Sequence, residues 1–469
     1  MWDRILRGAR VVDPKNGLDG VADIAIESGR IAAVGPELPG AAESEEDCSG
    51  LVAMPGLIDA HLHLGSVFGS PYGQRMAALA GVTTCLDMAG PFEDILEKTP
   101  EAGAGINVAS IEGFSPKAAF GTDEPSRAQI RGWIERTVEA GSIGVKLMGG
   151  HWPVPLSTCR AVVEEANDLG VYVAWHAGST TAGSNILGMR EVVEAARGMK
   201  LHLAHINAYC RGRVNPVADE AREAAELLIA NPNLWCEGYV SPLNGTILSC
   251  DEAGRVTDHV TQTCLATYGL PPTADGIRAA IRKGVLEVVR DTGVVSDLLG
   301  GAEGLALWEA MGTRTAGSFP VNPALSRLML AQARRPDGTF VVDAISTDGG
   351  CIPRNVQLSI GLSLVRLGAL TLAEFVQKTS LNPARHLRLF DRGHLTPGEA
   401  VADVTLFDLE RQAARETIVA GRTVVKDGRI LGSGAQFIAL EVGRAALEGK
   451  GFAVIATRFD DAEPERIRI

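Results

Sequence analysis

Hydrophobic and polar residues alternate in short segments near the start of the chain, and each segment ends at glycine, proline or asparagine. The segments read RILRGARVVDP, ADIAIESG and RIAAVG. The same alternating pattern occurs again near the end of the chain, in ADVTLFDLE, ETIVAGRTVVKDG and RILGSG. A period of two predicts strands with one buried face, and the breaking residues predict turns. We therefore expect one small β-domain assembled from both ends of the chain, residues 1–54 and 391–434.

Between these two pieces, short apolar runs alternate with segments of helical period. The runs are residues 57–63, 82–88, 106–113, 143–148, 171–176, 201–205, 234–240 and 342–347. The helical segments include residues 127–141, 158–170, 189–198 and 217–231. Buried strands that alternate with crossover helices are typical of a parallel sheet, and eight strands are the number that a (β/α)8 barrel needs.

The predicted fold is therefore α/β: a (β/α)8 TIM barrel over residues 55–390, with a small β-sandwich domain built from both ends of the chain. A doubly wound open sheet is the alternative, but it would need a glycine-rich phosphate turn, and neither GxGxxG nor GxxxxGK[ST] occurs. Residues 241–341 interrupt the rhythm as a long insertion, with helical period in 273–291 and 304–312. We expect this insertion over the carboxyl ends of the strands, and a partly helical tail over residues 435–469.

Composition narrows the function. The 469 residues are 46% hydrophobic, which supports a large core, and the net charge of −13 gives no general attraction for nucleic acid or anionic membranes. No run approaches the ~20 apolar residues of a membrane span, and the first residues lack the apolar core of a signal peptide. The eight cysteines lack CxxC spacing and suit free thiols. We expect a cytoplasmic homo-oligomer that binds a small-molecule substrate, and neither nucleic acid nor membrane.

Residues that can bind metal lie at or just beyond the carboxyl ends of several predicted strands. They are His61, His63, Lys146, His176, His205 and Asp348. On a parallel barrel these ends meet at one rim, so positions far apart in sequence come together. His61 and His63 are two residues apart and share one face of their strand, which suits a joint grip on one ion. Each of these residues alone has an ordinary structural explanation. Because all of them lie at the carboxyl ends of predicted strands, we interpret them together as a metal site.

The motifs PGLIDAHLHLG, GVTT, GVKLM, HAG, AHIN, STDGG, TSLNPARHLRL and LTPGEAVADVTLFD follow one another along almost the whole chain. Together they resemble the amidohydrolase superfamily, and within it the group of hydantoinase, dihydroorotase, isoaspartyl dipeptidase and D-aminoacylase. The resemblance implies two divalent metal ions. Zn²⁺ is the favoured metal, and Mn²⁺, Co²⁺ or Fe²⁺ are the alternatives. The resemblance also implies the ligands: the more buried ion on His61, His63 and Asp348, the more exposed ion on His176 and His205, and a bridging Lys146 carboxylated by CO₂.

Two other residues compete for places in this set. His202 is the alternative to His205 in the sixth strand, and since residues three apart in a strand face opposite sides, we expect only His205 to face inward. D-aminoacylases use a cysteine near the second and third strands as a bridging ligand. Cys85 lies in the second predicted strand, but its surroundings differ from that motif, so we interpret it as a packing residue.

The implied reaction is hydrolysis of an amide-type C–N bond, cyclic or linear, by a hydroxide that the metals generate. Asp348 would take the proton from the attacking water and deliver it to the leaving nitrogen. We expect a small substrate, such as an N-acyl amino acid, a dipeptide-like amide or a cyclic imide, that bears a carboxylate. Arginine can clamp a carboxylate, and tyrosine or histidine can donate to an oxyanion. The candidate substrate-binding residues in the loops after the strands are His151, Tyr209, Arg211 and Arg354.

Three alternatives stay open. A metal-dependent deaminase of a heterocycle would use the same barrel, but such enzymes lack the strand-four lysine and carry a glutamate soon after a histidine, which HAGST and HINAY do not provide. A non-catalytic scaffold related to hydantoinases would have lost metal ligands. An enzyme with a single metal would not need Lys146 as a bridge.

Overall fold

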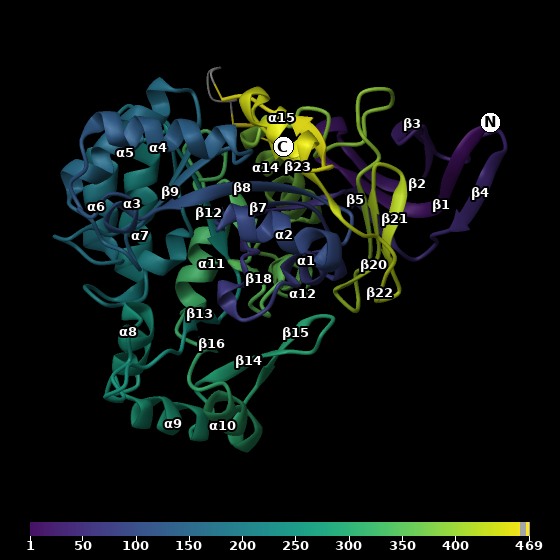
Figure 1. The fold of residues 1–469 in the computed structure, drawn as a ribbon. Helices are drawn as coiled ribbons and strands as arrows, with labels where there is room; N and C mark the ends of the chain where they lie inside the picture. Colours follow the sequence, from purple (N-terminus) through teal and green to yellow (C-terminus); the bar gives the residue numbers. More distant parts are fainter. Residues whose placement is uncertain (460–465, 469) are drawn as a thin grey trace.

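The structure is a computed structural model that describes residues 1–459 and 466–468. A strand barrel with helices around it occupies the centre, a β-sheet lies on one side of it, and a lobe of helices and short strands projects from one end (Figure 1). In the described part of the chain, no helix is both long enough and apolar enough to cross a membrane.

The barrel is a ring of parallel strands in sequence order. They are β6 (Leu57–His63), β7 (Val82–Ala89), β8 (Ile106–Phe114), β9 (Gly144–Met148), β10 (Tyr172–His176), β11 (Leu201–Leu203), β12 (Leu234–Tyr239), β17 (Ala344–Ser346) and β18 (Gly349–Gly350). β17 pairs with β12, and β18 pairs with β6. The last strand, interrupted at Thr347 and Asp348, therefore closes the ring, and the predicted (β/α)8 fold is confirmed.

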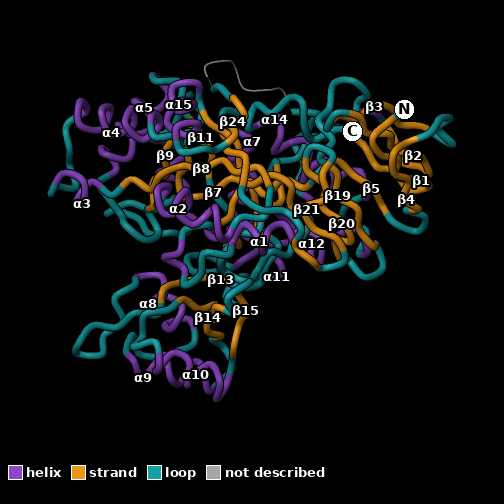
Figure 2. Tube along the Cα trace, turned by 45° about the vertical axis from the view of Figure 1, so that its right-hand side comes forward, coloured by secondary structure: helices purple, strands orange, loops and turns teal. Residues whose placement is uncertain are grey.

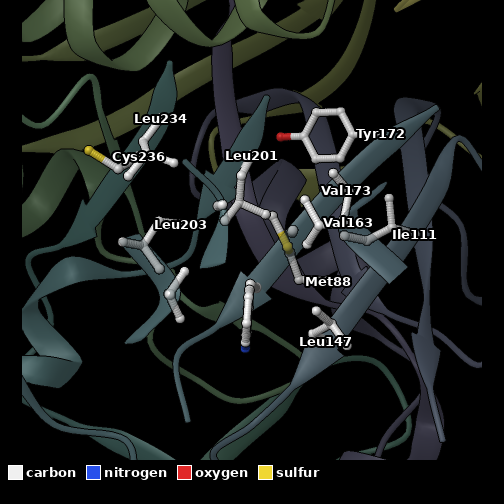
Figure 3. Close-up of a cluster of buried hydrophobic side chains, with 14 of the residues drawn as sticks. Met88, Ile111, Leu147, Val163, Tyr172, Val173, Leu201, Leu203, Leu234 and Cys236 are labelled. Atoms are coloured by element: carbon white, nitrogen blue, oxygen red, sulfur yellow. The ribbon is translucent and has the colours of Figure 1, made fainter. Parts of the chain in front are cut away.

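Helices cover the outside of the ring. They are α1 (Gly73–Leu79), α2 (Phe92–Ala102), α3 (Pro116–Phe120), α4 (Arg127–Glu139), α5 (Leu156–Asp168), α6 (Ile186–Ala195), α7 (Val217–Ala230), α12 (Gln357–Arg366), α13 (Leu372–Val376) and α14 (Asn382–His386). Ile130, Ile134 and Val138 recur every four residues in α4, so one face of this helix is buried. Figure 3 shows the strand side of this core, where Leu147 and Leu203 come from different strands.

The sheet beside the barrel contains strands from both ends of the chain. They are β1 (Trp2–Asp13), β2 (Leu18–Glu27), β3 (Arg30–Gly35), β4 (Ala42–Asp47), β5 (Val52–Pro55), β19 (Val404–Asp408), β20 (Ala413–Val419), β21 (Arg422–Lys426) and β22 (Arg429–Ile430). The antiparallel pairing of β5 with β19 joins the two groups. Ile24 and Val404 share one buried cluster, so neither end of the chain has a separate core here.

The lobe corresponds to the long insertion between β12 and β17, and it stands apart from the barrel in both views (Figures 1 and 2). The last helix of the insertion, α11 (Ala324–Gln332), instead packs on the barrel helix α7, with Leu330 in the core of the barrel. The lobe itself contains β13 (Asn244–Ile247), α8 (His259–Thr267), α9 (Ala274–Arg282), β14 (Glu287–Asp291), β15 (Ser296–Leu299), α10 (Gly301–Ala310) and β16 (Ala316–Phe319). Its strands form a four-stranded sheet over a small core that includes Trp308 and Phe319.

One prediction from helical period was wrong. Residues 273–291 are not one helix, because α9 ends near Gly284, whose φ of 70° is left-handed, and the β-branched residues that follow pair as β14. The tail is partly helical, as expected, in α15 (Glu441–Gly449), which lies between β23 (Ala435–Ala439) and β24 (Ala453–Ala456). β23 pairs in parallel with β8 of the barrel. Phe437 of β23 is fully buried, so this part of the tail packs against the barrel.

Leu203 provides a test of the packing between barrel and helices. Its side chain is fully buried in the cluster of Figure 3, so we expect Leu203→Ala to lower the free energy of unfolding by about 2–5 kcal/mol. Urea unfolding followed by tryptophan fluorescence measures this change. Leu367→Ala is the matched control, since that leucine is 77% exposed, and an equal loss in both variants would contradict the packing described here.

Candidate metal centre

Closure of the ring brings the first and last strands together at the carboxyl end of the barrel. His63 Nε2 lies 3.0 Å from Asp348 Oδ1, and His61 Nε2 lies 3.5 Å from the same oxygen. One ligand atom from each of these three residues lies within 4.8 Å of the other two, and all three side chains are buried. A pair of imidazoles and a carboxylate at this spacing has the geometry to hold one divalent ion.

Lys146 reaches this cluster from β9. Its Nζ lies 3.1 Å from His61 Nε2 and 3.5 Å from the Met88 carbonyl oxygen, and the side chain is buried. Burial lowers the pKa of Lys146 to about 8, although the charges of Asp348 and Glu237 oppose this shift. The neutral amine is the form that adds CO₂, so this environment suits a carboxylated lysine.

His176 and His205 line a cavity that opens above this cluster. Their ring centroids are 4.4 Å apart, and the His205 ring stacks on His61 at 4.8 Å. His176 Nε2 is 2.8 Å from the Ser184 hydroxyl, while His205 Nδ1 is buried without a hydrogen-bond partner among the described residues. Burial lowers the pKa of both imidazoles well below the ordinary value, which keeps them in the neutral form that binds metal.

Glycine is required beside His176. A Cβ atom at Gly150 would lie 2.1 Å from His176 Nε2, a distance that no side chain tolerates. The Gly-Gly pair after β9 therefore makes room for this imidazole at the mouth of the barrel.

Both His202 and His205 point into the barrel, so the prediction that only His205 faces inward was wrong, but the two residues lie at different levels. His202 is in register with Ala174, which is in register with Lys146, so His202 also points into the barrel. β11 ends at Leu203, and His205 has a left-handed φ of 33°, which turns its ring inward as well. His202 lies at a lower level, where its Nδ1 is 2.7 Å from the Tyr172 hydroxyl oxygen, and only His205 lines the cavity.

Glu237 is a buried residue of the centre that the sequence analysis missed. Its Oε1 is 2.7 Å from His61 Nδ1 and accepts the His205 main-chain N–H at 2.6 Å, while the Ser346 hydroxyl donates to Oε2. Burial acts to raise the pKa of this carboxyl, but His61 and His202 hold the pKa well below its usual range. The sequence did contain a signal for this residue, because Glu237 is a charged residue inside the otherwise apolar run LWCEGYV.

Asp59 supports the same strands from below. It accepts main-chain N–H bonds from His61 at 3.1 Å and from Thr347 at 3.2 Å, so it links the first strand to the interruption in the last. The side chain is fully buried, and burial raises its pKa to about 7. This acid, like Glu237, stands inside an apolar run of the sequence.

A cavity of about 650 Å³ opens above the cluster. The barrel side includes His63, Lys146, His176, His205 and Asp348, and the insertion adds Asn244, Ile247, Asp258 and His259. Glu112, at the end of β8, also lines the cavity, and burial raises its pKa to about 7. Glu112 is a polar residue near the end of a barrel strand, and this signal in the sequence could have identified it.

Two of the four candidate substrate-binding residues, His151 and Arg211, line the cavity. For both of them, contact with a substrate stays a prediction. His151 Nδ1 is 3.7 Å from Asp258 Oδ2 of the insertion. Arg211 donates to Asn322 Oδ1, Tyr239 Oη and Asn244 Oδ1 at 2.8–2.9 Å. All three acceptors are neutral, and no carboxylate of the described residues pairs with this guanidinium.

The other two candidates have partners within the protein. Arg354 lines the cavity, but its Nη2 is 2.8 Å from Asp348 Oδ2, so it binds the predicted catalytic carboxylate rather than standing free. The Tyr209 hydroxyl donates to the Ala204 carbonyl and accepts the Ala177 N–H, and Tyr209 is not among the residues that line the cavity. Cys85 is fully buried in a hydrophobic cluster, in agreement with a packing role.

Comparisons with known proteins point to one family. The model of the amidohydrolase family matches residues 52–209. The chain is 26% identical to a dihydroorotase of Geobacter metallireducens over 86% of this chain and 89% of that protein. It is 32% identical to an allantoinase of Solibacter usitatus over 47% of this chain and 55% of the relative.

A solved structure shares the fold across nearly the whole chain. It is the N-acyl-D-glutamate deacylase of Bordetella bronchiseptica in complex with zinc and a phosphonate inhibitor, with a TM-score of 0.66 and 17% identity. The match covers 93% of this chain and 99% of that protein. The likeness therefore supports a barrel with an attached β-domain.

The two histidines of the sixth strand allow a direct test. We expect His205→Ala to retain fewer Zn²⁺ ions per chain than the wild type, because His205 lines the cavity beside His176. His202→Ala should retain the wild-type number, since its ring lies below the cluster. Elemental analysis after dialysis against zinc and then buffer counts the ions, and a reversed order of the two variants would contradict this placement.

Proposed function

Because the chain belongs to the amidohydrolase superfamily, we propose that it is a metal-dependent hydrolase of an amide-type C–N bond in a small substrate that bears a carboxylate. The observation that carries this proposal is the meeting of His61, His63 and Asp348 beside the buried amine of Lys146, at the floor of the cavity. The dihydroorotase and allantoinase relatives support hydrolysis of a C–N bond other than a peptide bond.

The donor set fits two divalent ions. His61, His63 and Asp348 would hold one ion, His176 and His205 the other, and a carboxylated Lys146 would lie between them. Neutral imidazoles with carboxylate and carbamate oxygens suit Zn²⁺, and the unpartnered, buried Nδ1 of His205 indicates a missing partner. Such ions lower the pKa of a water molecule toward neutrality and polarise a carbonyl group.

Asp348 would act as the proton shuttle. An ionised carboxylate can accept a proton from the attacking water and then return it to the leaving nitrogen, which departs poorly unless it is protonated. Burial acts to raise the pKa of Asp348, but the Arg354 guanidinium and the hydrogen bond with His63 hold it well below its usual range. Arg354 therefore keeps Asp348 in the form that can accept a proton.

Arg211 is the proposed partner of the substrate carboxylate. It lines the cavity, it is half-buried, and its three hydrogen bonds to neutral groups orient the guanidinium without neutralising its charge. A substrate carboxylate would supply the missing negative charge through a charge-assisted hydrogen bond. His151, beside His176 in the same cavity, is placed to donate to the carbonyl oxygen as charge develops there.

We expect Asp348→Asn to lower kcat by about 10²- to 10⁴-fold, because the amide cannot accept the proton. Steady-state kinetics on the best substrate measures the change, and zinc analysis of the same sample separates loss of the shuttle from loss of an ion. Wild-type kcat in a zinc-loaded Asp348→Asn variant would rule out Asp348 as the shuttle.

A substrate screen tests the reaction class. We expect the zinc-loaded chain to release amine or carboxylate from at least one compound in a panel of N-acyl D- and L-amino acids, dipeptide-like amides and cyclic ureides or imides. Inactivity toward the whole panel, together with release of ammonia from a heterocycle, would favour the deaminase alternative.

Arg211 is tested on the substrate that this screen identifies. We expect Arg211→Met to raise KM by about 10- to 100-fold for the carboxylate substrate, the loss expected for one hydrogen bond to a charged group. The methyl ester of the same compound is the matched control, and its KM should change little. Equal effects on acid and ester would show that Arg211 does not read the carboxylate.

A further inference from the structure

We propose that Glu237 is a positioning residue that orients one ligand of each metal subsite, His61 and His205, through a single carboxylate. The inference rests on the function proposed above and extends it to a residue outside the six ligands. Glu237 lies in the middle of β12 (Leu234–Tyr239) and is 0% exposed, so no bulk water competes for its oxygens.

The contact with His61 determines which ring nitrogen is free. An ionised carboxylate only accepts hydrogen bonds, so His61 Nδ1, 2.7 Å from Glu237 Oε1, must carry the proton. With that proton on Nδ1, the nitrogen left to bind an ion is Nε2, which faces Lys146 Nζ at 3.1 Å and Asp348 Oδ1 at 3.5 Å. Glu237 thus presents the unprotonated nitrogen of His61 to the place where the proposed ion would bind.

The contact with His205 acts on the main chain. If β11 continued as an extended strand, alternation from the inward-facing His202 would point residue 205 out of the barrel. Instead the strand ends at Leu203, and His205 has a φ of 33°, a conformation that residues other than glycine rarely adopt. The 2.6 Å hydrogen bond from His205 N–H to Glu237 Oε1 offsets the cost of this turn and brings the ring beside His176.

A third contact fixes the carboxylate itself. The Ser346 hydroxyl of β17 donates to Glu237 Oε2, so the side chain connects neighbouring strands on both sides of β12. With Oε2 held by Ser346 and Oε1 shared by His61 and His205, rotation of the carboxylate would break all three contacts at once. The geometry couples the two subsites through one rigid group.

Zinc affinity of the full chain tests the role of Glu237. We expect Glu237→Ala to weaken both Zn²⁺ sites by about 10- to 100-fold, the usual range for an outer-sphere partner, in competition titrations with a chromophoric chelator. In Glu237→Gln the amide oxygen can still serve His61 and His205 while the NH₂ group faces Ser346. That variant should lose less, about fivefold, because only the charge is removed. The visible spectrum of the Co²⁺-loaded chain should change in the same order.

Asp403→Asn is the matched control. Asp403 is also a buried carboxylate with three partners, Arg392, Asn107 and Ala420, but it contacts none of the six ligands. We expect this variant to lower the melting temperature of the metal-free chain and to leave both zinc affinities unchanged.

The possible results separate the inference from the proposed function. A wild-type chain that binds two zinc ions, together with a folded Glu237→Ala variant of unchanged affinity, would overturn the role of Glu237 alone. If Glu237→Ala does not fold, unchanged zinc affinity and an unchanged Co²⁺ spectrum in Glu237→Gln would do the same. If Asp403→Asn weakened zinc binding as much as Glu237→Ala does, the loss of affinity would reflect general destabilisation and the role of Glu237 would be overturned. A wild-type chain without zinc affinity would overturn the proposed function as well.

Discussion

The pairing that closes the barrel between β6 and β18 is the constraint on which the site depends. Gly350 is in register with His63, the Asp348 N–H donates to the His61 carbonyl at 2.8 Å, and the Cys351 N–H donates to the His63 carbonyl at 2.8 Å. A Cβ atom at position 350 would lie 2.0 Å from the His63 carbonyl oxygen, and its φ is 80°, so only glycine allows this approach. The first and last strands are far apart in sequence, and this pairing places Asp348 against the two histidines.

The barrel contains buried carboxylates near the site. Asp59, Asp87 and Glu237 are fully buried, and burial of a carboxylate is unfavourable unless hydrogen bonds compensate for the lost water. Each of the three accepts main-chain N–H groups next to a proposed ligand: Asp59 from His61, Asp87 from Leu64 and Glu237 from His205. Burial of these carboxylates therefore lowers the stability of the core, while their hydrogen bonds hold the ends of the strands in fixed positions.

The sequence predicted the eight barrel strands and the six proposed ligands because two simple signals agree there: apolar runs of strand length, and metal-binding residues at their carboxyl ends. It could not distinguish Arg211 from Arg354, since both are arginines a few residues beyond a strand. Only the structure shows that Arg354 pairs with Asp348 while Arg211 has neutral partners. The role of Glu237 and the strand pairing of residues 435–439 likewise depend on contacts between distant segments, which periodicity does not contain.

The most direct test of the account is anomalous scattering at the zinc absorption edge from crystals of the chain grown with Zn²⁺ and bicarbonate. The account predicts two anomalous peaks at the mouth of the barrel, one against His61, His63 and Asp348 and one against His176 and His205, with extra density on Lys146 Nζ between them. A structure with zinc bound elsewhere, or with these side chains turned away from any ion, would contradict it.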